Sequence, residues 1–419
     1  MISQAILLLQ LLPFTSDPGV GGEGPDAVRN DSSLASWQDP NEFRVFWKDS
    51  LRMETRDGMA KIRIGGRFHQ DYSYVKNNPR VAAAVGTSQL EDGVNFRRAR
   101  VYLRGELWDS LEFKTQYDFA GGMAEFKDVY IGTTGNPVNF RVGQFKEPFS
   151  LEELTSSNNI TFMERSLANA FTPGRSTGIM AHGTASDDNL TFAVGIFRDS
   201  DDQGDQMSDA EWSATGRITG TPIYKDEEGD YQVLHLGLSL GVHSPDQGMY
   251  RVRARPEMGF GPRFVNTGNF AVEDVTLVGL EAAWVNNRYS VQGEYIQSDA
   301  NAVAGPDPSF SGYYVEGGFF LTEDHRNYKR SKGAFSGVKP GSNAFIDDDE
   351  GCGALEAKLR YSSIDLNDGP ILGGELTDIG AGLNWYTSNN TRVMFEVIQA
   401  DLDGVDDTLI GQIRIQFAF

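Results

Sequence analysis

The chain has 419 residues, and its 37 Lys and Arg side chains against 59 Asp and Glu side chains give a formal net charge of −22. This acidic balance disfavours nucleic acid as a partner, because binding to the phosphate backbone requires an excess of basic groups. Cys352 is the only cysteine, so an internal disulfide framework and a multi-cysteine metal site are excluded.

The N-terminus contains an apolar stretch over residues 5–14 that has the length of a signal-peptide core, although no Lys or Arg precedes it. An apolar tail without a targeting role is the alternative. Turn-forming residues follow, so we expect a signal peptide and leader over residues 1–25 and a further leader segment over residues 26–57. The folded domain is then expected over residues 58–419.

After Gly58 the sequence alternates between apolar and polar residues in short runs, which clusters of Asp, Asn, Gly and Pro separate. This pattern is typical of an all-β fold. No window approaches the roughly 18 apolar residues of a membrane-spanning helix. The strands of a transmembrane β-barrel escape that test, because about ten residues that alternate between lipid and lumen suffice for each strand.

Seventeen runs are plausible strands, and closed bacterial barrels have an even number, so we expect sixteen strands in a closed antiparallel transmembrane β-barrel. Such a barrel is wide enough for a water-filled channel. Long acidic connections over 199–209 and 322–349, opposite tight turns, fit this architecture, as does the terminal Phe419. The runs are 60–74, 95–107, 110–120, 124–133, 138–145, 176–186, 189–198, 211–221, 231–243, 248–259, 275–286, 289–299, 311–321, 352–362, 375–387, 391–400 and 408–419.

Five segments of this domain resemble the phosphate-selective porin family, the anion and polyphosphate channels of bacterial outer membranes. The segments are GGRF at 65–68, FRRARVYLRGELW at 96–108, YDFA at 117–120, the stretch 142–175 and RVRARPEMG at 251–259. The resemblance implies a sixteen-stranded outer-membrane porin, usually a homotrimer, with an extracellular loop folded into the lumen. It also implies passive diffusion of small anions through a constriction lined with Arg and Lys, without catalysis or a cofactor.

A candidate arginine ladder lies in the run 248–259, where Arg251, Arg253 and Arg255 alternate with Val252 and Ala254. Alternation by two places the three arginines on one face of a strand; a solvated face that binds nothing specific is the alternative. Fixed guanidinium groups in a narrow lumen raise the local concentration of anions and bind phosphate-like oxygens through their planar fork.

Strand parity assigns Arg63, Arg67 and Arg98 to the lumen, whereas Arg97 shares the apolar face and is expected to contribute only from the strand edge. The resemblance places the positions of these four arginines about the constriction, and those of Ser156, Ser157 and Arg165 on the inward loop. The predicted anion-binding or pore-lining residues are therefore Arg63, Arg67, Arg97, Arg98, Lys127, Ser156, Ser157, Arg165, Arg251, Arg253 and Arg255.

Three positions depart from the phosphate-selective pattern. Glu153, Asn158 and Glu257 stand where those members carry basic residues, while Lys127 stands near a position that they fill with an acid. The selectivity for phosphate or polyphosphate therefore stays open, and a general porin for polar solutes is the alternative.

An enzyme built on the barrel and a secreted β-rich binding protein are the remaining alternatives. The sequence GRSTG around Ser176 fits a hydrolase nucleophile elbow, but that turn needs a strand before it and a helix after it. Pro173 precedes it and an alternating run follows, so we expect no catalytic residue. The five histidines are scattered, and the acidic loop 199–205 lacks the Glu that ends an EF-hand, so we expect no metal site.

Overall fold

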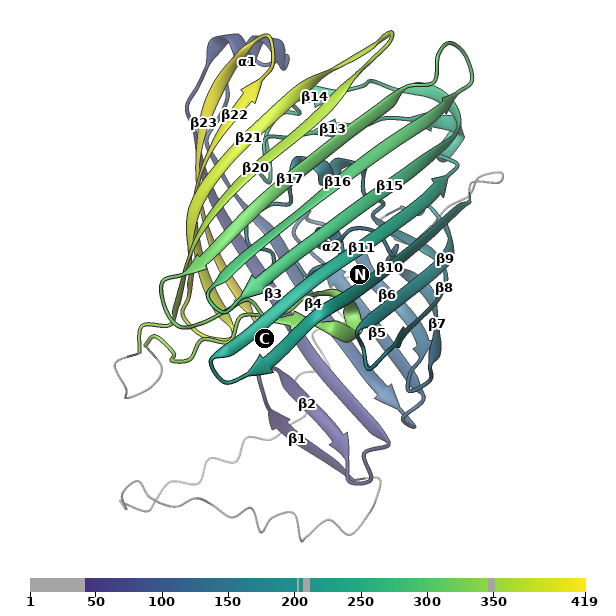
Figure 1. Cartoon of the computed structure of the whole chain (residues 1–419), viewed down its shortest axis with the longest axis vertical. Helices are drawn as coiled ribbons and strands as arrows, with labels where there is room; N and C mark the ends of the chain where they lie inside the picture. The colour runs from purple at the N-terminus through teal and green to yellow at the C-terminus, as the bar shows by residue number, and fades with distance from the viewer. Residues whose placement is uncertain (1–41, 202, 206–211, 346–350) are drawn as a thin grey trace.

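The structure is a computed structural model that describes residues 42–201, 203–205, 212–345 and 351–419. Within these residues, sixteen long antiparallel strands form a closed barrel, because the first barrel strand, β3 (Ala60–Val75), pairs with the last, β23 (Asp406–Ala418). The strands are tilted against the barrel axis (Figure 1), as closure of a sheet requires. The predicted fold class is confirmed.

Each barrel strand pairs with its neighbour in chain order. The strands between β3 and β23 are β4 (Gly93–Leu107), β5 (Leu111–Asp118), β6 (Glu125–Thr133), β7 (Val138–Lys146), β8 (Arg175–Ala185), β9 (Leu190–Arg198), β10 (Ser213–Glu227), β11 (Asp230–His243), β15 (Phe270–Asn286), β16 (Tyr289–Ala302), β17 (Ser309–Phe320), β20 (Ala354–Asp368), β21 (Ile371–Tyr386) and β22 (Thr391–Leu402).

One of the seventeen predicted strands is wrong. The run 248–259 lies in the connection between β11 and β15, where it forms only β12 (Met249–Tyr250) and β13 (Arg253–Ala254). β12 pairs with the start of β15, and β13 pairs with β14 (Val265–Asn266) inside the same connection. Pro256 follows soon after β13, and its missing N–H cannot take part in a continuous ladder.

The two ends of the barrel differ. One end carries the connections 76–92, with α1 (Pro79–Ala84), 147–174, with α2 (Leu151–Leu154) and η2 (Leu167–Phe171), and 244–269, with η3 (Asp246–Gly248). The other end carries short turns such as 108–110, 228–229 and 287–288. Short turns face the periplasm in bacterial barrels and long loops face the exterior.

The prediction for residues 322–349 is wrong in one respect: this long connection lies at the end of the short turns. Its described part contains β18 (Tyr328–Lys329), η4 (Arg330–Lys332) and β19 (Ala334–Phe335). It folds inward, because Tyr328 and Phe335 are buried against Val233 and Val285 of the wall. The lumen is therefore narrowed from both ends.

The barrel wall is apolar outside and polar inside. On β22, for example, Phe395 and Val397 are exposed, whereas Arg392 and Glu396 are buried. Only one face of each strand needs to be apolar in such a wall, which explains the modest hydrophobic content of 39%. Among the described residues, no helix has the length and apolar character needed to cross a membrane.

A hydrophobic core lies inside the barrel rather than between layers. Phe149, Leu167 and Phe171 of the connection 147–174 are buried together with Leu277 of β15 and Ile398 of β22. This connection, called the constriction loop below, therefore fills the side of the lumen formed by β15–β23 and leaves the side formed by β3–β10 more open.

Part of the expected leader segment forms a β-hairpin below the short-turn end (Figure 1). Its strands are β1 (Phe43–Trp47) and β2 (Leu51–Thr55), and β2 pairs with the first residues of β3. The expected signal peptide and the leader up to residue 41 lie outside the described residues.

Candidate functional site

The constriction loop is held by carboxylates and guanidinium groups of the wall. Glu294 accepts hydrogen bonds from the backbone N–H groups of Leu151 and Glu152, at 2.9 and 2.7 Å. On the other side, Arg392 donates to the carbonyl oxygen of Ile160 at 2.9 Å. Buried charges that bind several backbone groups fix a loop more firmly than apolar packing alone.

The constriction loop separates two water-accessible chambers. The vestibule, of about 390 Å³, is lined by the constriction loop and the connection 244–269 at the long-loop end. The lower chamber, of about 540 Å³, is lined by β3–β10, the constriction loop and the inward connection 321–353. Arg165 lines both chambers, so they meet at this loop.

Arg97 and Arg98 both turn toward the interior, which corrects the parity argument for Arg97. His69 of β3 pairs with Arg98, but Gln70 pairs with Phe96, so Arg97 is an extra residue in β4. Such a β-bulge re-aims a side chain that strict alternation would send to the other face. As a result, Arg97 lines the vestibule and Arg98 lines the lower chamber.

Arg67 and Arg98 both line the lower chamber. Within the described residues, neither forms an ion pair with a carboxylate, and the Nε of each is buried without a hydrogen-bond partner. Arg67 donates instead to the hydroxyl oxygens of Ser156 and Ser157, at 3.0 and 3.2 Å. A fork of donors beside two hydroxyl groups suits an oxyanion.

The departures at Glu153 and Asn158 change the partners of their neighbours. Glu153 forms ion pairs with Lys146 at 2.9 Å and Arg165 at 3.1 Å. Burial alone would raise the pKa of Glu153, but Arg165 and Lys146 outweigh it and lower the pKa to about 2. The Oδ1 atom of Asn158 accepts a hydrogen bond from the Nε2–H of His69 at 2.9 Å. Glu153 therefore reduces the positive charge that two of the cations offer to an anion.

The predicted arginine ladder exists, but on a loop rather than on a barrel strand. Arg251 and Arg253 are exposed, Val252 and Ala254 are buried beneath them, and Arg255 follows. All three arginines line the vestibule together with Arg263. Burial and then the neighbouring Arg255, Arg253 and Arg251 lower the pKa of Arg263 to about 10, as expected where like charges gather.

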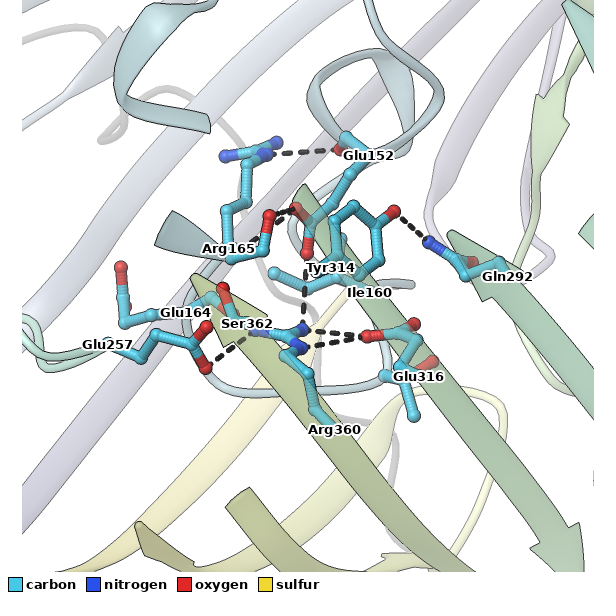
Figure 2. A network of polar contacts seen from close by, with 12 residues as sticks. Glu152, Ile160, Glu164, Arg165, Glu257, Gln292, Tyr314, Glu316, Arg360 and Ser362 are labelled. Atoms are coloured by element: carbon cyan, nitrogen blue, oxygen red, sulfur yellow. Dashed lines mark hydrogen bonds and ion pairs between the residues drawn. The ribbon is translucent and has the colours of Figure 1, made fainter. Parts of the chain in front are cut away.

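Glu257, the departure within the ladder segment, is a buried partner of Arg360 (Figure 2). Arg360 donates to Glu257 at 2.9 Å, to Glu316 at 2.8 Å and to Glu152 at 3.1 Å. It thereby ties the connection 244–269 and the constriction loop to the wall. Burial raises the pKa of Glu257 to about 7 even though Arg360 opposes this, and the nearby Glu152 adds to the rise.

The remaining predicted residues have other surroundings. Lys127 forms an ion pair with Glu125 at 2.7 Å. Arg63 lies toward the short-turn end, opposite Arg104 across the strands and over the ring of Tyr102. Arg165 donates to the backbone carbonyls of the constriction loop as well as to Glu153, so it shapes the loop that it lines.

The sequence does not predict most cations of the lower chamber. Among the described residues, twelve basic side chains line this chamber against the two carboxylates of Glu112 and Asp128. Arg100 and Arg104 occupy even positions of β4, as Arg98 does, so strand parity indicates that they face the lumen. The other cations come from strands and a connection that are far apart in the sequence. The missed residues are Arg100, Arg104, Lys114, Arg141, Lys146, Arg175, Arg217, Lys329 and Lys332.

Ser176 is not in a nucleophile elbow. It lies in strand β8, is buried, and its hydroxyl donates to Glu147 at 2.7 Å. In the part of the chain that the structure describes, no group of three or more His, Cys, Asp or Glu side chains could hold a metal ion.

A sixteen-stranded barrel with inward loops and a cation-lined lumen defines the class of protein: a porin of the bacterial outer membrane. The model of the family described as "Phosphate-selective porin O and P" matches residues 62–419. The chain belongs to this family, and it is a diffusion channel for small anions rather than an enzyme.

Individual relatives agree with this assignment. The chain is 26% identical to Porin O of Pseudomonas aeruginosa over 89% of this chain and 91% of the relative. It is similar in fold to the anion-selective porin from Comamonas acidovorans, with a TM-score of 0.53 and 14% identity over 86% of this chain and 100% of that one. The outer membrane channel DcaP of Acinetobacter baumannii gives a TM-score of 0.52 and 10% identity, over 87% and 99% of the two chains.

Proposed function

We propose that the chain conducts small oxyanions of the phosphate class, from the arginine ladder of the vestibule to a binding site at Arg67 and Arg98. The observation that carries this proposal is that Arg67 and Arg98 line the lower chamber beside Ser156 and Ser157, each with a buried, unsatisfied Nε and without a carboxylate partner among the described residues. A buried polar group without a partner is costly, so an anion that binds both arginines would remove this cost.

Binding at this site is expected to be weaker than in a lumen without Glu153. That carboxylate neutralises part of the charge of Lys146 and Arg165. A channel must bind its ion weakly enough to release it, so phosphate would occupy the site and still pass. The relative named Porin O belongs to the same family, which also supports phosphate as the cargo.

The test is block of chloride conductance by phosphate in a planar bilayer. Phosphate is expected to reduce the chloride current of the wild-type channel. R98Q should raise the half-blocking concentration roughly ten- to a hundredfold, since a hydrogen bond to a charged group contributes roughly 1.5–3 kcal/mol. The matched variant is R141Q, because Arg141 lines the same chamber but is paired with Glu112 at 2.7 Å. Equal effects of R98Q and R141Q would contradict the proposed site.

We also propose that the chain assembles as a homotrimer, as its resemblance to the porin family implies. The molar mass of the unheated protein in detergent, measured by light scattering, tests this assembly. A mass of three chains is expected, and a mass of one chain would contradict it.

A further inference from the structure

The carboxylate of Glu164 occupies the guanidinium fork of Arg97. Arg97 donates from Nε to one carboxylate oxygen and from Nη2 to the other, both at 2.8 Å. This bidentate geometry is the one in which a free arginine binds a carboxylate or phosphate ligand. Within the constriction loop, Glu164 therefore takes the place that a permeating anion would take at Arg97.

The pair lies on the vestibule side of the constriction loop and is next in sequence to residues that line the lower chamber. Arg97 and Glu164 both line the vestibule that also contains the arginine ladder, while the next residue, Arg98, lines the lower chamber. The side chain of Arg97 is 30% exposed and that of Glu164 is 13% exposed. An anion that leaves the ladder can therefore reach Arg97 before it reaches Arg98.

Glu164 has a second cationic partner that would remain if Arg97 turned to an anion. Arg414 donates to Glu164 at 2.8 Å and is fully buried, where Asp71 binds the same guanidinium at 2.6 Å. If Arg97 exchanges Glu164 for an anion, Glu164 therefore keeps Arg414 as a partner. A buried charge left without a partner would be strongly unfavourable, and this exchange avoids it. Burial tends to raise the pKa of Glu164, but Arg97 and Arg414 outweigh it and keep the pKa well below its usual range.

We propose that Glu164 is a specificity-determining residue of the channel: it competes with permeating anions for Arg97 and so weakens anion binding between the ladder and the lower chamber. The inference rests on the proposed function and adds a residue that controls the strength of the site. A series of weak sites favours passage over retention. Anions that bind a guanidinium fork through two oxygens displace the carboxylate more readily than chloride does.

The test compares E164Q, R97Q and the double variant in the phosphate-block measurement. E164Q keeps the shape but removes the competing charge, so phosphate should block chloride current at a several-fold lower concentration. R97Q should weaken the block, and adding E164Q to R97Q should change it little, since the effect of Glu164 acts through Arg97. E164D, whose shorter side chain can stay with Arg414, should shift the block in the same direction as E164Q.

The outcomes separate this inference from the proposed function. If phosphate does not block the wild-type channel, the proposed phosphate site is wrong. If phosphate blocks the wild type and E164Q leaves the half-blocking concentration unchanged, Glu164 is not a competitor. An equal shift by E164Q with and without Arg97 would also overturn the inference, because it would reflect a general change in charge. Heat-modifiable migration of each variant checks that the barrel has formed.

Discussion

At the scale of single residues, one extra residue in β4 decides which cations reach each chamber. The bulge turns Arg97 inward beside Arg98, so two neighbours in sequence serve opposite sides of the constriction. Strict alternation would have sent Arg97 toward the lipid, where an unpaired charge is costly. Because of the bulge, the guanidinium group of Arg97 faces the lumen instead of the lipid.

Lys332 of the inward connection gives the lower chamber a charge that depends on pH. Its side chain is open to water in the lumen, but the surrounding barrel encloses it. This enclosure lowers the pKa of Lys332 to about 8, and the nearby cations Lys329, Arg104, Lys114 and Arg141 add to the effect. The ammonium is charged below that pH and neutral above it. We expect anion selectivity to fall as the pH rises through about 8.

Reversal potentials of the wild type and K332M, measured in a salt gradient on both sides of this pH, check the expectation. The variant should have lower selectivity at neutral pH and a flatter pH profile. A wild-type profile that stays flat, or a K332M profile as steep as the wild type, would show that Lys332 does not control the selectivity.

The sequence predicts residues of the site where regular alternation holds. Arg67 and Arg98 follow strand parity and line the lower chamber. Ser156 and Ser157 of the constriction loop, which the resemblance to the porin family indicated, line the same chamber. Arg97 could not be placed, because a bulge has no reliable signal in one sequence. The partners of Glu153 and Glu257 could not be predicted either, since Arg165 and Arg360 meet them only through the packing of loops against the wall.

At the scale of elements, the strand pattern predicted the wall but not the loops inside it. The run 248–259 alternates as regularly as a strand, yet it does not continue as one. Pro256 and the glycines that follow it lie between β13 and β14, which form a short hairpin. The alternation itself is real, because Val252 and Ala254 are buried and the arginines are not. The position of the connection 321–353 depends on strand count, and one false strand reverses the end to which it is assigned.

Arg360 links two loops to the wall through its contacts with Glu257, Glu152 and Glu316. The contact with Glu257 depends on pH, because the carboxyl group of Glu257 has a raised pKa. The folded state raises the pKa of Glu257 from 4.5 to about 7, so it binds this proton more tightly than the unfolded state. Stability is then highest below the unfolded pKa and falls as the pH rises through about 7. The pKa difference corresponds to about 3 kcal/mol.

The variant E257Q stays neutral at every pH and keeps a similar shape. Its thermal transition in detergent should match the wild type near about pH 4 and lie above it beyond about pH 8, where only the wild type carries the buried charge. A wild type that is more stable than E257Q at the higher pH would show that the ion pair with Arg360 outweighs burial.

The hairpin β1–β2 continues the outer face of the wall below the rim. Trp47 and Val45 pair with Leu51 and Met53, and these pair with Ile64 and Ile62 of β3, so the apolar side chains stay in register. Trp47 also stacks on the terminal Phe419, with ring centroids 6.4 Å apart. An aromatic and apolar face at this level is typical of the membrane interface.

A fluorophore on V45C, in a C352S background, should therefore be quenched by spin-labelled phospholipids in reconstituted vesicles. The control is R44C, which projects from the opposite face of the same strand. Quenching of both labels to the same extent would contradict an apolar face that contacts lipid.

At the scale of the whole molecule, net charge is a poor guide to the field that an ion meets. The chain carries −22 in total, yet in the part that the structure describes the lower chamber has twelve basic side chains against two acidic ones. Focusing of the field in a lumen with low-dielectric walls makes these local charges dominate the passage of ions. An acidic protein can thus be a channel for anions.

The reversal potential of the purified channel in a planar bilayer, under a potassium chloride gradient, measures the ion selectivity of the lumen. We expect a potential of the sign set by chloride, and a shift toward zero when R67Q and R98Q are combined. A potential set by potassium, or one that the double variant leaves unchanged, would contradict a lumen whose selectivity comes from these arginines.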